Sequence, residues 1–264
     1  MAHAYKLALI TGATSGIGEE YARQLPESTD LILTGRNTEK LKELATELGS
    51  KTRTIETISA DLATPEGVAA LMERVKSKPI DLFINNAGLG YYGAFECHTP
   101  SQESTMVQVN VVAVAALAHA LCPQMAKQAA ENGTKAGMII VASVAGFMAL
   151  PWFATYAATK MFDLALAEAL AEEYKHTPLK IQALCPGPTR TNFGKRAGVP
   201  ADRGPDKSAM DVADVVTLSL RKLGKKRVVV PGLLNKLTVL LPKLLPRPLV
   251  TRIGGAAIKR TKQM

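Results

Sequence analysis

Hydrophobic residues gather along the chain in short, nearly continuous runs that alternate with longer amphipathic stretches. Seven runs are typical of buried strands, at 7–12, 31–35, 54–62, 81–88, 138–143, 180–187 and 227–232. The stretches between them have the apolar period of helices, the longest from about Ser101 to Ala130. Apolar strands separated by helices indicate a parallel sheet covered on both faces. Right-handed crossovers then favour an α/β fold with a doubly wound parallel sheet, the Rossmann fold.

The pattern changes beyond the last strand-like run, where leucines recur at helical spacing while Lys236 and Lys243 lie on another face. Pro242 is expected to kink or divide this helix, and two later prolines to end it. We therefore predict one dinucleotide-binding and catalytic domain at 1–232 and a basic amphipathic extension at 233–264. The extension is either a lid or subunit contact, or a segment that lies on an anionic membrane. Its leucines are Leu233, Leu237, Leu240, Leu241, Leu244 and Leu245.

A glycine-rich loop, TGATSGIG at residues 11–18, follows the first strand-like run and opens the first predicted helix. Gly12, Gly16 and Gly18 permit a tight turn and a close approach of the backbone to a pyrophosphate, which then lies at the helix N-terminus. Plain structural turns are also rich in glycine, but this position after the first strand favours a dinucleotide site. The other candidate contacts in the loop are Thr14, Ser15 and Ile17.

The residue after the second strand-like run indicates which dinucleotide binds. Sites for NAD usually offer a carboxylate there, about 20 residues beyond the glycines, to hold the ribose 2′-hydroxyl. This chain has Arg36 followed by Asn37. Because a guanidinium pairs with a 2′-phosphate that a carboxylate would repel, the sequence predicts NADP (NADPH) as the cofactor. The alternative is an Arg36 that meets only solvent.

A phenol and an amine, Tyr156 and Lys160, stand four residues apart in the run YAATK. On a helix they share one face, and the ammonium stabilises the phenolate form of a side chain whose ordinary pKa is about 10. A place in the first helical turn acts in the same direction. The pair is then a general acid–base, and Ser143, after the preceding strand, can offer a hydroxyl to the same carbonyl oxygen. Taken alone, this pattern is too short to be specific.

Six motifs taken together make the pattern specific. They are TGATSGIG, NNAG at 85–88, Asn110, Ser143, YAATK and PGPTRT at 186–191. In this order and spacing, the chain resembles the classical short-chain dehydrogenase/reductases, near the 3-oxoacyl and steroid reductase branches, from about Lys6 to Gly232. The resemblance implies an NADP-dependent oxidoreductase that interconverts a carbonyl and an alcohol by hydride transfer.

The resemblance also implies roles for individual residues. Tyr156 protonates the carbonyl oxygen, and Lys160 assists it and holds the nicotinamide ribose. Ser143 orients the carbonyl, and Asn110 holds a water that links Lys160 to solvent. Alternatively, Asn110 is a polar residue inside a helix and the asparagines of NNAG only brace a turn. Further cofactor contacts are expected from Asp61, Leu62, Asn86, Ala87, Gly88, Pro186, Gly187, Thr189 and Thr191.

The expected substrate is a small hydrophobic ketone or oxoacyl compound. Lys195 and Arg196 meet either a phosphate-bearing carrier or solvent. Seven apolar side chains either form a substrate pocket or cover the sheet edge: Tyr91, Tyr92, Phe95, Phe147, Met148, Trp152 and Phe193. There are two rival functions. The first is a cofactor-binding regulator that has lost its catalytic activity, and the second is a membrane-surface interaction protein on a reductase scaffold. The intact catalytic motifs argue against the first rival.

The run 162–174 carries apolar residues at helical spacing with alanines between them. Such a helix can serve the sheet with one face and a two-fold partner with another. In the family that this chain resembles, helices of this kind pair between subunits. We therefore expect a homodimer or homotetramer, although a simple core helix has a similar pattern.

The net charge of +9 is unevenly distributed: 20 basic and 23 acidic residues precede Val215, and the last 50 residues hold 12 basic and no acidic ones. Because the positive charge belongs to the tail, a nucleic-acid-binding domain loses its main support. Three separated cysteines indicate a reducing, cytoplasmic compartment, and four isolated histidines offer no metal-ligand spacing. We expect no secretory signal and no uncharged apolar window of membrane-spanning length.

Overall fold

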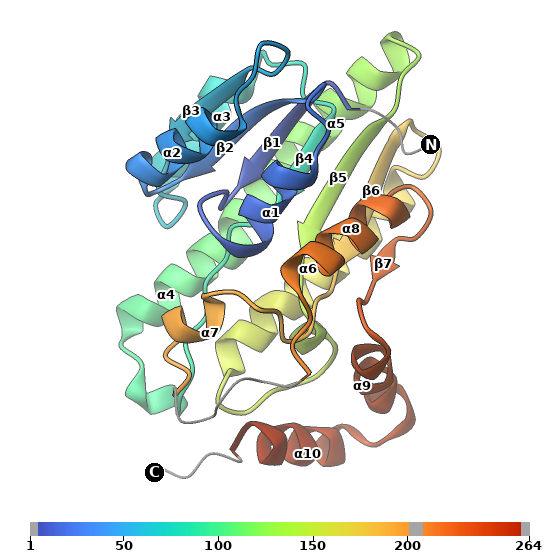
Figure 1. Ribbon diagram of the computed structural model, residues 1–264. Coiled ribbons are helices and arrows are strands. Elements are labelled where there is room, and N and C mark those ends of the chain that lie inside the picture. Colours follow the sequence, from blue (N-terminus) through green and yellow to red (C-terminus); the bar gives the residue numbers. More distant parts are fainter. Residues whose placement is uncertain (1–4, 201–207, 260–264) are drawn as a thin grey trace.

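In the computed structural model, which describes residues 5–200 and 208–259, seven strands form one sheet in the order β3-β2-β1-β4-β5-β6-β7 (Figure 1). Every neighbouring pair is parallel. The predicted doubly wound parallel sheet is therefore confirmed. The strands are β1 (Leu7–Thr11), β2 (Asp30–Gly35), β3 (Ile55–Ser59), β4 (Leu82–Asn85), β5 (Ala136–Val141), β6 (Leu179–Leu184) and β7 (Val228–Val229).

Helices cover both faces of the sheet. One face carries α1 (Gly16–Gln24), α2 (Thr38–Leu48) and α8 (Val212–Lys222). The other carries α3 (Pro65–Val75), α5 (Val114–Glu131) and α6 (Ala154–Glu173). Toward the end where the strands terminate lie α4 (Pro100–Val107), α7 (Phe193–Arg196), α9 (Leu233–Leu244) and α10 (Arg247–Lys259) (Figure 1). Short helical turns are η1 (Phe95–Cys97), η2 (Gln108–Ala113) and η3 (Val144–Phe147).

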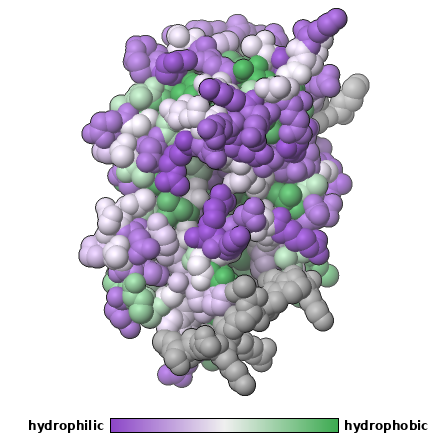
Figure 2. Space-filling view, turned by 60° about the vertical axis from the view of Figure 1, so that its left-hand side comes forward, coloured by the Kyte–Doolittle hydropathy of each residue, from purple (hydrophilic) through white to green (hydrophobic). Residues whose placement is uncertain are grey.

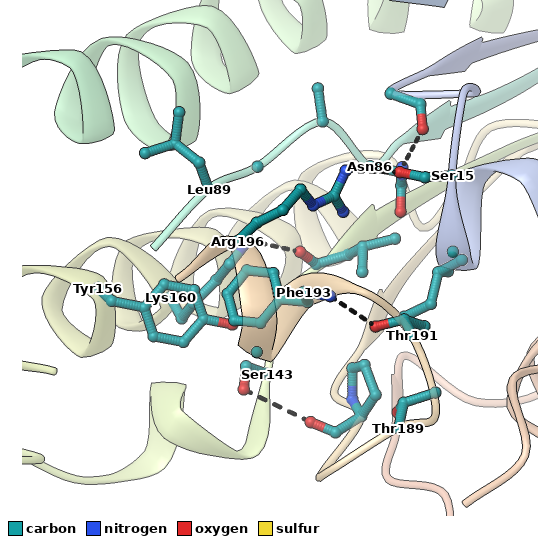
Figure 3. Close-up of a pocket in the computed structure, with 18 of the residues that line it drawn as sticks. Ser15, Asn86, Leu89, Ser143, Tyr156, Lys160, Thr189, Thr191, Phe193 and Arg196 are labelled. Atoms are coloured by element: carbon teal, nitrogen blue, oxygen red, sulfur yellow. Dashed lines mark hydrogen bonds between the residues drawn. The ribbon is translucent and has the colours of Figure 1, made fainter. Parts of the chain in front are cut away.

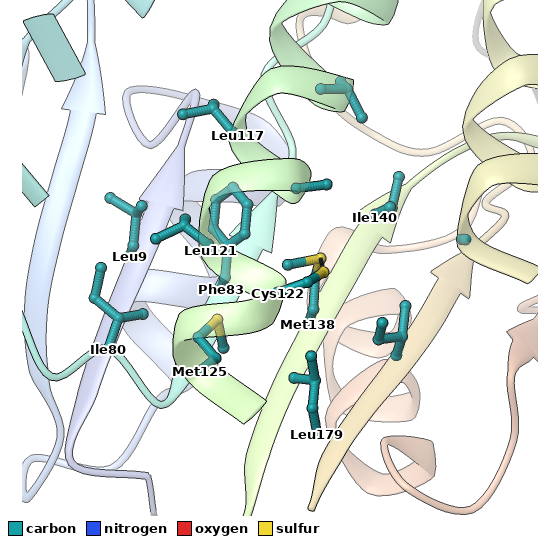
Figure 4. Packing of buried hydrophobic residues seen from close by; sticks show 14 of the residues in the cluster. Leu9, Ile80, Phe83, Leu117, Leu121, Cys122, Met125, Met138, Ile140 and Leu179 are labelled. Carbon is teal, nitrogen blue, oxygen red and sulfur yellow. Dashed lines mark hydrogen bonds between the residues drawn. The ribbon is translucent and has the colours of Figure 1, made fainter. Parts of the chain in front are cut away.

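The core consists of two layers, because successive strand residues point to opposite faces of the sheet. Ile10 and Ile139 belong to the layer under α1, α2 and α8. Phe83 and Met138 belong to the layer under α3, α5 and α6, where Leu121 of α5 packs with them (Figure 4). Burial on both faces explains why the strands are almost entirely apolar.

Two elements differ from the prediction. The long helix expected from about Ser101 to Ala130 is interrupted by η2, a π-helical segment that carries Asn110. A wider turn of this kind is rare and often occurs at functional sites. The last strand has only two residues, Val228–Val229, of the run predicted at 227–232. It stops there because Pro231 has no N–H to donate and Gly232 takes a positive φ of 84° at the start of α9.

One segment has the length and apolar composition of a membrane span, contrary to the sequence-based expectation. It covers Pro100–Glu131, and half of its most apolar window is buried inside the protein. Its side chains include Leu117, Leu121 and Met125 of the core (Figure 4). A core helix that lies against a sheet satisfies the same criterion of length and composition as a span.

The C-terminal extension forms two helices, but the division lies at residues 245–246 and not at Pro242 as predicted. Pro242 lies in the last turn of α9, which ends at Leu244. The second helix, α10, begins at Arg247, and Pro248 is tolerated there because the first N–H groups of a helix have no intrahelical partner. The extension rests on the domain: Asn235 is buried against Gly187, where a Cβ would lie 2.1 Å from the Asn235 amide oxygen.

Candidate active site

A pocket of about 920 Å³ opens where the strands end. It gathers segments that lie far apart in the sequence, as expected for ligand sites in doubly wound sheets. Most of the predicted site residues line it: Gly12, Thr14, Ser15, Gly16, Ile17, Arg36, Asp61, Leu62, Asn86, Ala87, Gly88, Ser143, Tyr156, Lys160, Pro186, Gly187, Thr189 and Thr191. The sequence motifs therefore come together in one cavity.

Three predicted residues do not line this pocket. Gly18 lies behind the loop, where a Cβ would be 2.4 Å from the carbonyl oxygen of Gly12. Asn37 caps α2, because its side chain accepts a hydrogen bond from the backbone N–H of Lys40 at 2.9 Å. Asn110 is fully buried in η2. In the local structure, Gly18 allows close packing behind the loop, Asn37 caps a helix and Asn110 braces the segment around it.

The glycine-rich loop is held in shape by the segment after β4. Gly12 has a positive φ of 65°, and the amide Nδ2 of Asn86 donates to the carbonyl oxygen of Thr11 at 2.8 Å. Asn86 therefore braces the loop as well as lining the pocket. Ser15 is the N-cap of α1, and its side chain makes no capping hydrogen bond. The first N–H groups of this helix thus stay available to an anion in the pocket.

Tyr156 and Lys160 project from the start of α6, and Ser143 follows β5 (Figure 3). Tyr156 is the third residue of the helix, as predicted for a phenol in the first turn. Its ring packs against the rings of Phe153 and Phe193, whose centroids are 5.6 Å and 5.4 Å away. These contacts fix the direction in which the phenol points.

The hydroxyl of Ser143 accepts a hydrogen bond from the N–H of Ala145 at 3.1 Å and donates to the carbonyl oxygen of Pro186 at 3.4 Å. The second bond is long, so the Ser143 proton is only weakly engaged. Ser143 can therefore donate to a carbonyl oxygen that enters the pocket. Two threonines of the same region make local hydrogen bonds. Thr189 donates to the carbonyl oxygen of Gly187 at 3.0 Å, and Thr191 accepts from the N–H of Phe193 at 3.2 Å.

Lys160 is 4% exposed, and its Nζ lies 6.0 Å from the centroid of the Tyr156 ring. It donates to the carbonyl oxygen of Val141 and to Oδ2 of Asp163, both at 2.8 Å. Burial disfavours the charged form of Lys160 and lowers its pKa. The electrostatic effects of Asp163, and after it of Tyr156, are together larger, so the pKa of the amine is raised. The site therefore holds an ammonium beside the phenol.

Both polar atoms of the Asn110 side chain are hydrogen-bonded within the protein. Its Oδ1 accepts from the N–H of Leu89 at 3.0 Å, and its Nδ2 donates to the carbonyl oxygen of Leu89 at 2.8 Å and to Oγ1 of Thr159 at 3.0 Å. Asn110 thus acts as a polar brace inside a helical segment. A Cβ on Gly88 would lie 3.4 Å from Nζ of Lys160 and 3.5 Å from Oδ1 of Asn110, so these two groups approach the same point. The water-holding role of Asn110 stays a prediction.

The apolar wall of the pocket differs from the one proposed from sequence. Of the seven apolar candidates only Phe193 lines it, while Phe95 is 62% exposed. The wall also contains Leu89, Leu150, Phe153, Val199 and, from the extension, Ile258. Residues 201–207, which follow Val199 and Pro200 of the pocket in the sequence, lie outside the described residues.

Two polar residues near the site make contacts that the sequence did not predict. Arg196 lines the pocket, and its Nη1 donates to Oγ of Ser15 in the glycine-rich loop at 2.8 Å. Asp163 is the buried partner of Lys160. Its spacing of three residues from Lys160 on a predicted helix was the available signal. Within the described ranges 5–200 and 208–259, no group of three or more His, Cys, Asp or Glu residues gathers as metal ligands would.

Residues 6–199 match the family described as short chain dehydrogenase. The chain belongs to this family. Dehydrogenase/reductase SDR family member 7B from Bos taurus is 30% identical over 274 residues, which cover 97% of this chain and 82% of that protein. The predicted resemblance is therefore confirmed, and the chain is a dehydrogenase/reductase of the oxidoreductase class.

Solved structures of two bacterial proteins are similar to this chain. A short-chain dehydrogenase from Sphingobium yanoikuyae in complex with NADPH has a TM-score of 0.76 at 30% identity, covering 92% of this short-chain dehydrogenase and 97% of that chain. A 3-ketoacyl-(acyl-carrier-protein) reductase from Brucella melitensis complexed with NADH has a TM-score of 0.74 at 25% identity, covering 86% and 96%. These relatives bind different nicotinamide cofactors, so the choice of cofactor depends on this chain's own residues.

Proposed function

We propose that this short-chain dehydrogenase is an NADP(H)-dependent oxidoreductase that reduces a carbonyl to an alcohol or catalyses the reverse reaction. One observation carries the proposal: Ser143, Tyr156 and Lys160 line the same pocket as the glycine-rich loop and Arg36. The loop and the start of α1 fit a pyrophosphate, and Arg36 fits a 2′-phosphate. The NADPH complex of the Sphingobium yanoikuyae relative supports this assignment.

When bound in this pocket, the cofactor would supply a hydride to the carbonyl carbon. Tyr156 gives its phenolic proton to the carbonyl oxygen, which completes the alcohol. Ser143 donates a hydrogen bond to the same oxygen, and the Lys160 ammonium stabilises the phenolate that remains. In the oxidation direction the same phenolate accepts the proton of the alcohol.

The pocket wall supports a hydrophobic substrate. Leu89, Leu150 and Phe153 contribute apolar surface beside Tyr156. The test is a screen of ketones, aldehydes and oxoacyl thioesters in which the consumption of NADPH and of NADH is followed in parallel. We expect turnover of an apolar ketone or oxoacyl compound with NADPH. Folded protein that binds NADPH but turns over none of these compounds would favour the cofactor-binding regulator instead.

We also propose that the enzyme is a homodimer or homotetramer. Val107 and Val112 are 39% and 44% exposed on α4 and η2, and both elements pack against α6. Phe162 and Leu166 of α6 are themselves only partly buried. An apolar surface of this kind is typical of a subunit interface. Light scattering at micromolar concentration is expected to give two or four times the chain mass of 28.1 kDa, and the mass of one chain would contradict the proposal.

For the C-terminal extension we propose a peripheral contact with an anionic membrane from a cytoplasmic location. The leucines of α9 are exposed, from 37% at Leu241 to 73% at Leu233. By contrast, the face of the molecule in Figure 2 is mostly hydrophilic, with small and scattered hydrophobic areas. No acidic residue follows Asp214, so only cations accompany these leucines in the sequence. Apolar burial and attraction to anionic lipid then act together.

The extension also contributes to the pocket. Gly254 and Gly255 of α10 pack against Leu150 and Pro151, and Ile258 lines the cavity. A membrane under α9 would therefore lie near the pocket wall, which suits substrates that dissolve in lipid. Because α9 also rests on Gly187, truncation of the extension would disturb the site, and single substitutions on the exposed surface are the sharper test.

The full-length protein is expected to co-sediment with anionic vesicles at low salt and less so at high salt. We choose Leu237 for substitution, because its side chain is 51% exposed. Leu237→Glu should weaken binding about ten-fold or more, because burial of a leucine side chain is worth roughly 1.5–3 kcal/mol. Phe95→Glu, at a side chain that is 62% exposed outside the extension, is the control and should bind like the wild type. Absence of binding at low salt would leave the extension as a lid or a subunit contact.

A further inference from the structure

A buried carboxylate lies beside the candidate acid–base pair and has no part in the reaction described above. Asp163 is 0% exposed on α6, and its Oδ2 accepts a hydrogen bond from Nζ of Lys160 at 2.8 Å. Its Oδ1 is buried and has no hydrogen-bond partner among the described residues. A buried carboxylate with half of its hydrogen-bonding capacity unused is costly, so its presence next to Lys160 needs a reason.

The presence of the Asp163 carboxylate is explained by the requirements of the buried Lys160 side chain. A buried ammonium is unstable unless it is paired and hydrogen-bonded. The carbonyl oxygen of Val141 alone cannot offset the loss of hydration, whereas the Asp163 carboxylate brings a full opposite charge at contact distance. An ammonium has three N–H donors. Val141 and Asp163 take two of them, and the third remains for the pocket that Lys160 lines.

We propose that Asp163 is a positioning residue of this site: its carboxylate keeps Lys160 as a buried ammonium and fixes Nζ at the end of β5, beside Tyr156. The consequence for catalysis rests on the proposed reductase function. The consequence for Lys160 itself does not require turnover and is measurable in the cofactor-free protein.

The other titratable groups around Asp163 do not supply the same charge. Cys185, which follows β6, is buried, and burial raises its pKa to about 12, so it is neutral. Glu103 on α4 is bound to His98, and Lys180 on β6 donates to the carbonyl oxygen of Thr177. On α6 itself, Glu168, Glu172 and Glu173 are exposed. Asp163 is thus the buried carboxylate in contact with Lys160.

The sign of the effect follows from charge alone. Asp163 contributes one negative charge to a cluster in which Lys160 and Tyr156 bind protons, and a negative charge makes those protons harder to remove. Without that charge the cluster loses its first proton at lower pH, whichever of the two groups releases it. Carbonyl reduction needs both protons, so its alkaline limb must move to lower pH.

Asp163→Asn is the decisive variant, because it keeps the shape and an oxygen that accepts from Nζ but removes the charge. The test compares pH profiles of kcat/KM for reduction. The ratio of the Asp163→Asn value to the wild-type value should be lower on the alkaline side than on the plateau by a factor of about ten or more. Glu173→Gln removes the same charge from an exposed position on the same helix and should leave the profile unchanged. If Asp163 has only a packing role, Asp163→Asn will show the wild-type profile, which overturns the proposal.

A second measurement needs no turnover and separates this proposal from the reductase function. In cofactor-free protein with ¹³C-labelled lysine, NMR follows the Cε signal of Lys160, assigned by its absence from Lys160→Arg. The signal should be that of an ammonium at neutral pH in the wild type and should titrate at lower pH in Asp163→Asn. Equal titration in both proteins, or a neutral amine in the wild type at neutral pH, overturns the proposal. The second outcome decides the matter even if Asp163→Asn does not fold.

Discussion

Tyr156→Phe is expected to lose nearly all carbonyl reduction while it binds NADPH about as well as the wild type. The variant removes only the phenolic proton, and general acid catalysis is worth on the order of 10² to 10⁴ in rate. The ring keeps its neighbours Phe153 and Phe193, so the pocket should keep its shape. Steady-state NADPH consumption gives the rate, and a fluorescence titration with NADPH gives the affinity.

The matched control is Tyr91→Phe, which also removes one phenolic oxygen near this end of the sheet. Tyr91 packs against His98 with ring centroids 5.9 Å apart and is not among the residues that line the pocket. The control should keep close to wild-type activity. If Tyr156→Phe retains most of its activity, another group donates the proton and the proposed mechanism is wrong.

The strands were predictable because a parallel sheet covered on both faces needs strands that are apolar on both sides. The two layers of the core and the meeting of the motifs at the strand ends follow from that pattern. The same reasoning placed Tyr156 in the first turn of α6, one turn before Lys160. The family resemblance then supplied the candidate roles, which local patterns alone do not specify.

Other features depend on contacts that a local pattern does not contain. The π-helical segment around Asn110 has backbone hydrogen bonds between residues five apart instead of four apart, and over so short a segment this hardly changes the apolar period. The apolar composition of Pro100–Glu131 fits a span or a core helix equally well until the sheet is seen against it. The pocket wall at Leu150 and Phe153 is set by how loops and α10 pack together.

The role of Asp163 was predictable only in part from the sequence. Its spacing from Lys160 on a helix predicts that the two side chains are neighbours. An exposed pair of this kind contributes little to stability, whereas a buried pair controls the charge of both partners. Only the packing of α6 against the sheet shows that Asp163 is fully buried.

The second large effect concerns the choice of cofactor. Arg36→Gln is expected to weaken NADPH binding roughly 10- to 100-fold, because a charge-assisted pair with the 2′-phosphate is worth about 1.5–3 kcal/mol. NADH lacks this phosphate, so its affinity should change little. Arg36 is exposed, lines the pocket and immediately follows β2, next to the start of α2. It makes no ion pair with any residue that the structure describes, so its guanidinium is available.

Lys42→Gln provides the matched control. Lys42 is an exposed cation on α2 that is not among the residues that line the pocket with Arg36, so this variant removes the same charge without touching the site. Both dissociation constants should stay near the wild-type values in the control. The NADPH affinity of the wild type should also fall with added salt more steeply than the NADH affinity, because only NADPH brings the additional charged pair. Equal losses for both cofactors in Arg36→Gln would make Arg36 a structural residue and remove the basis for assigning NADP.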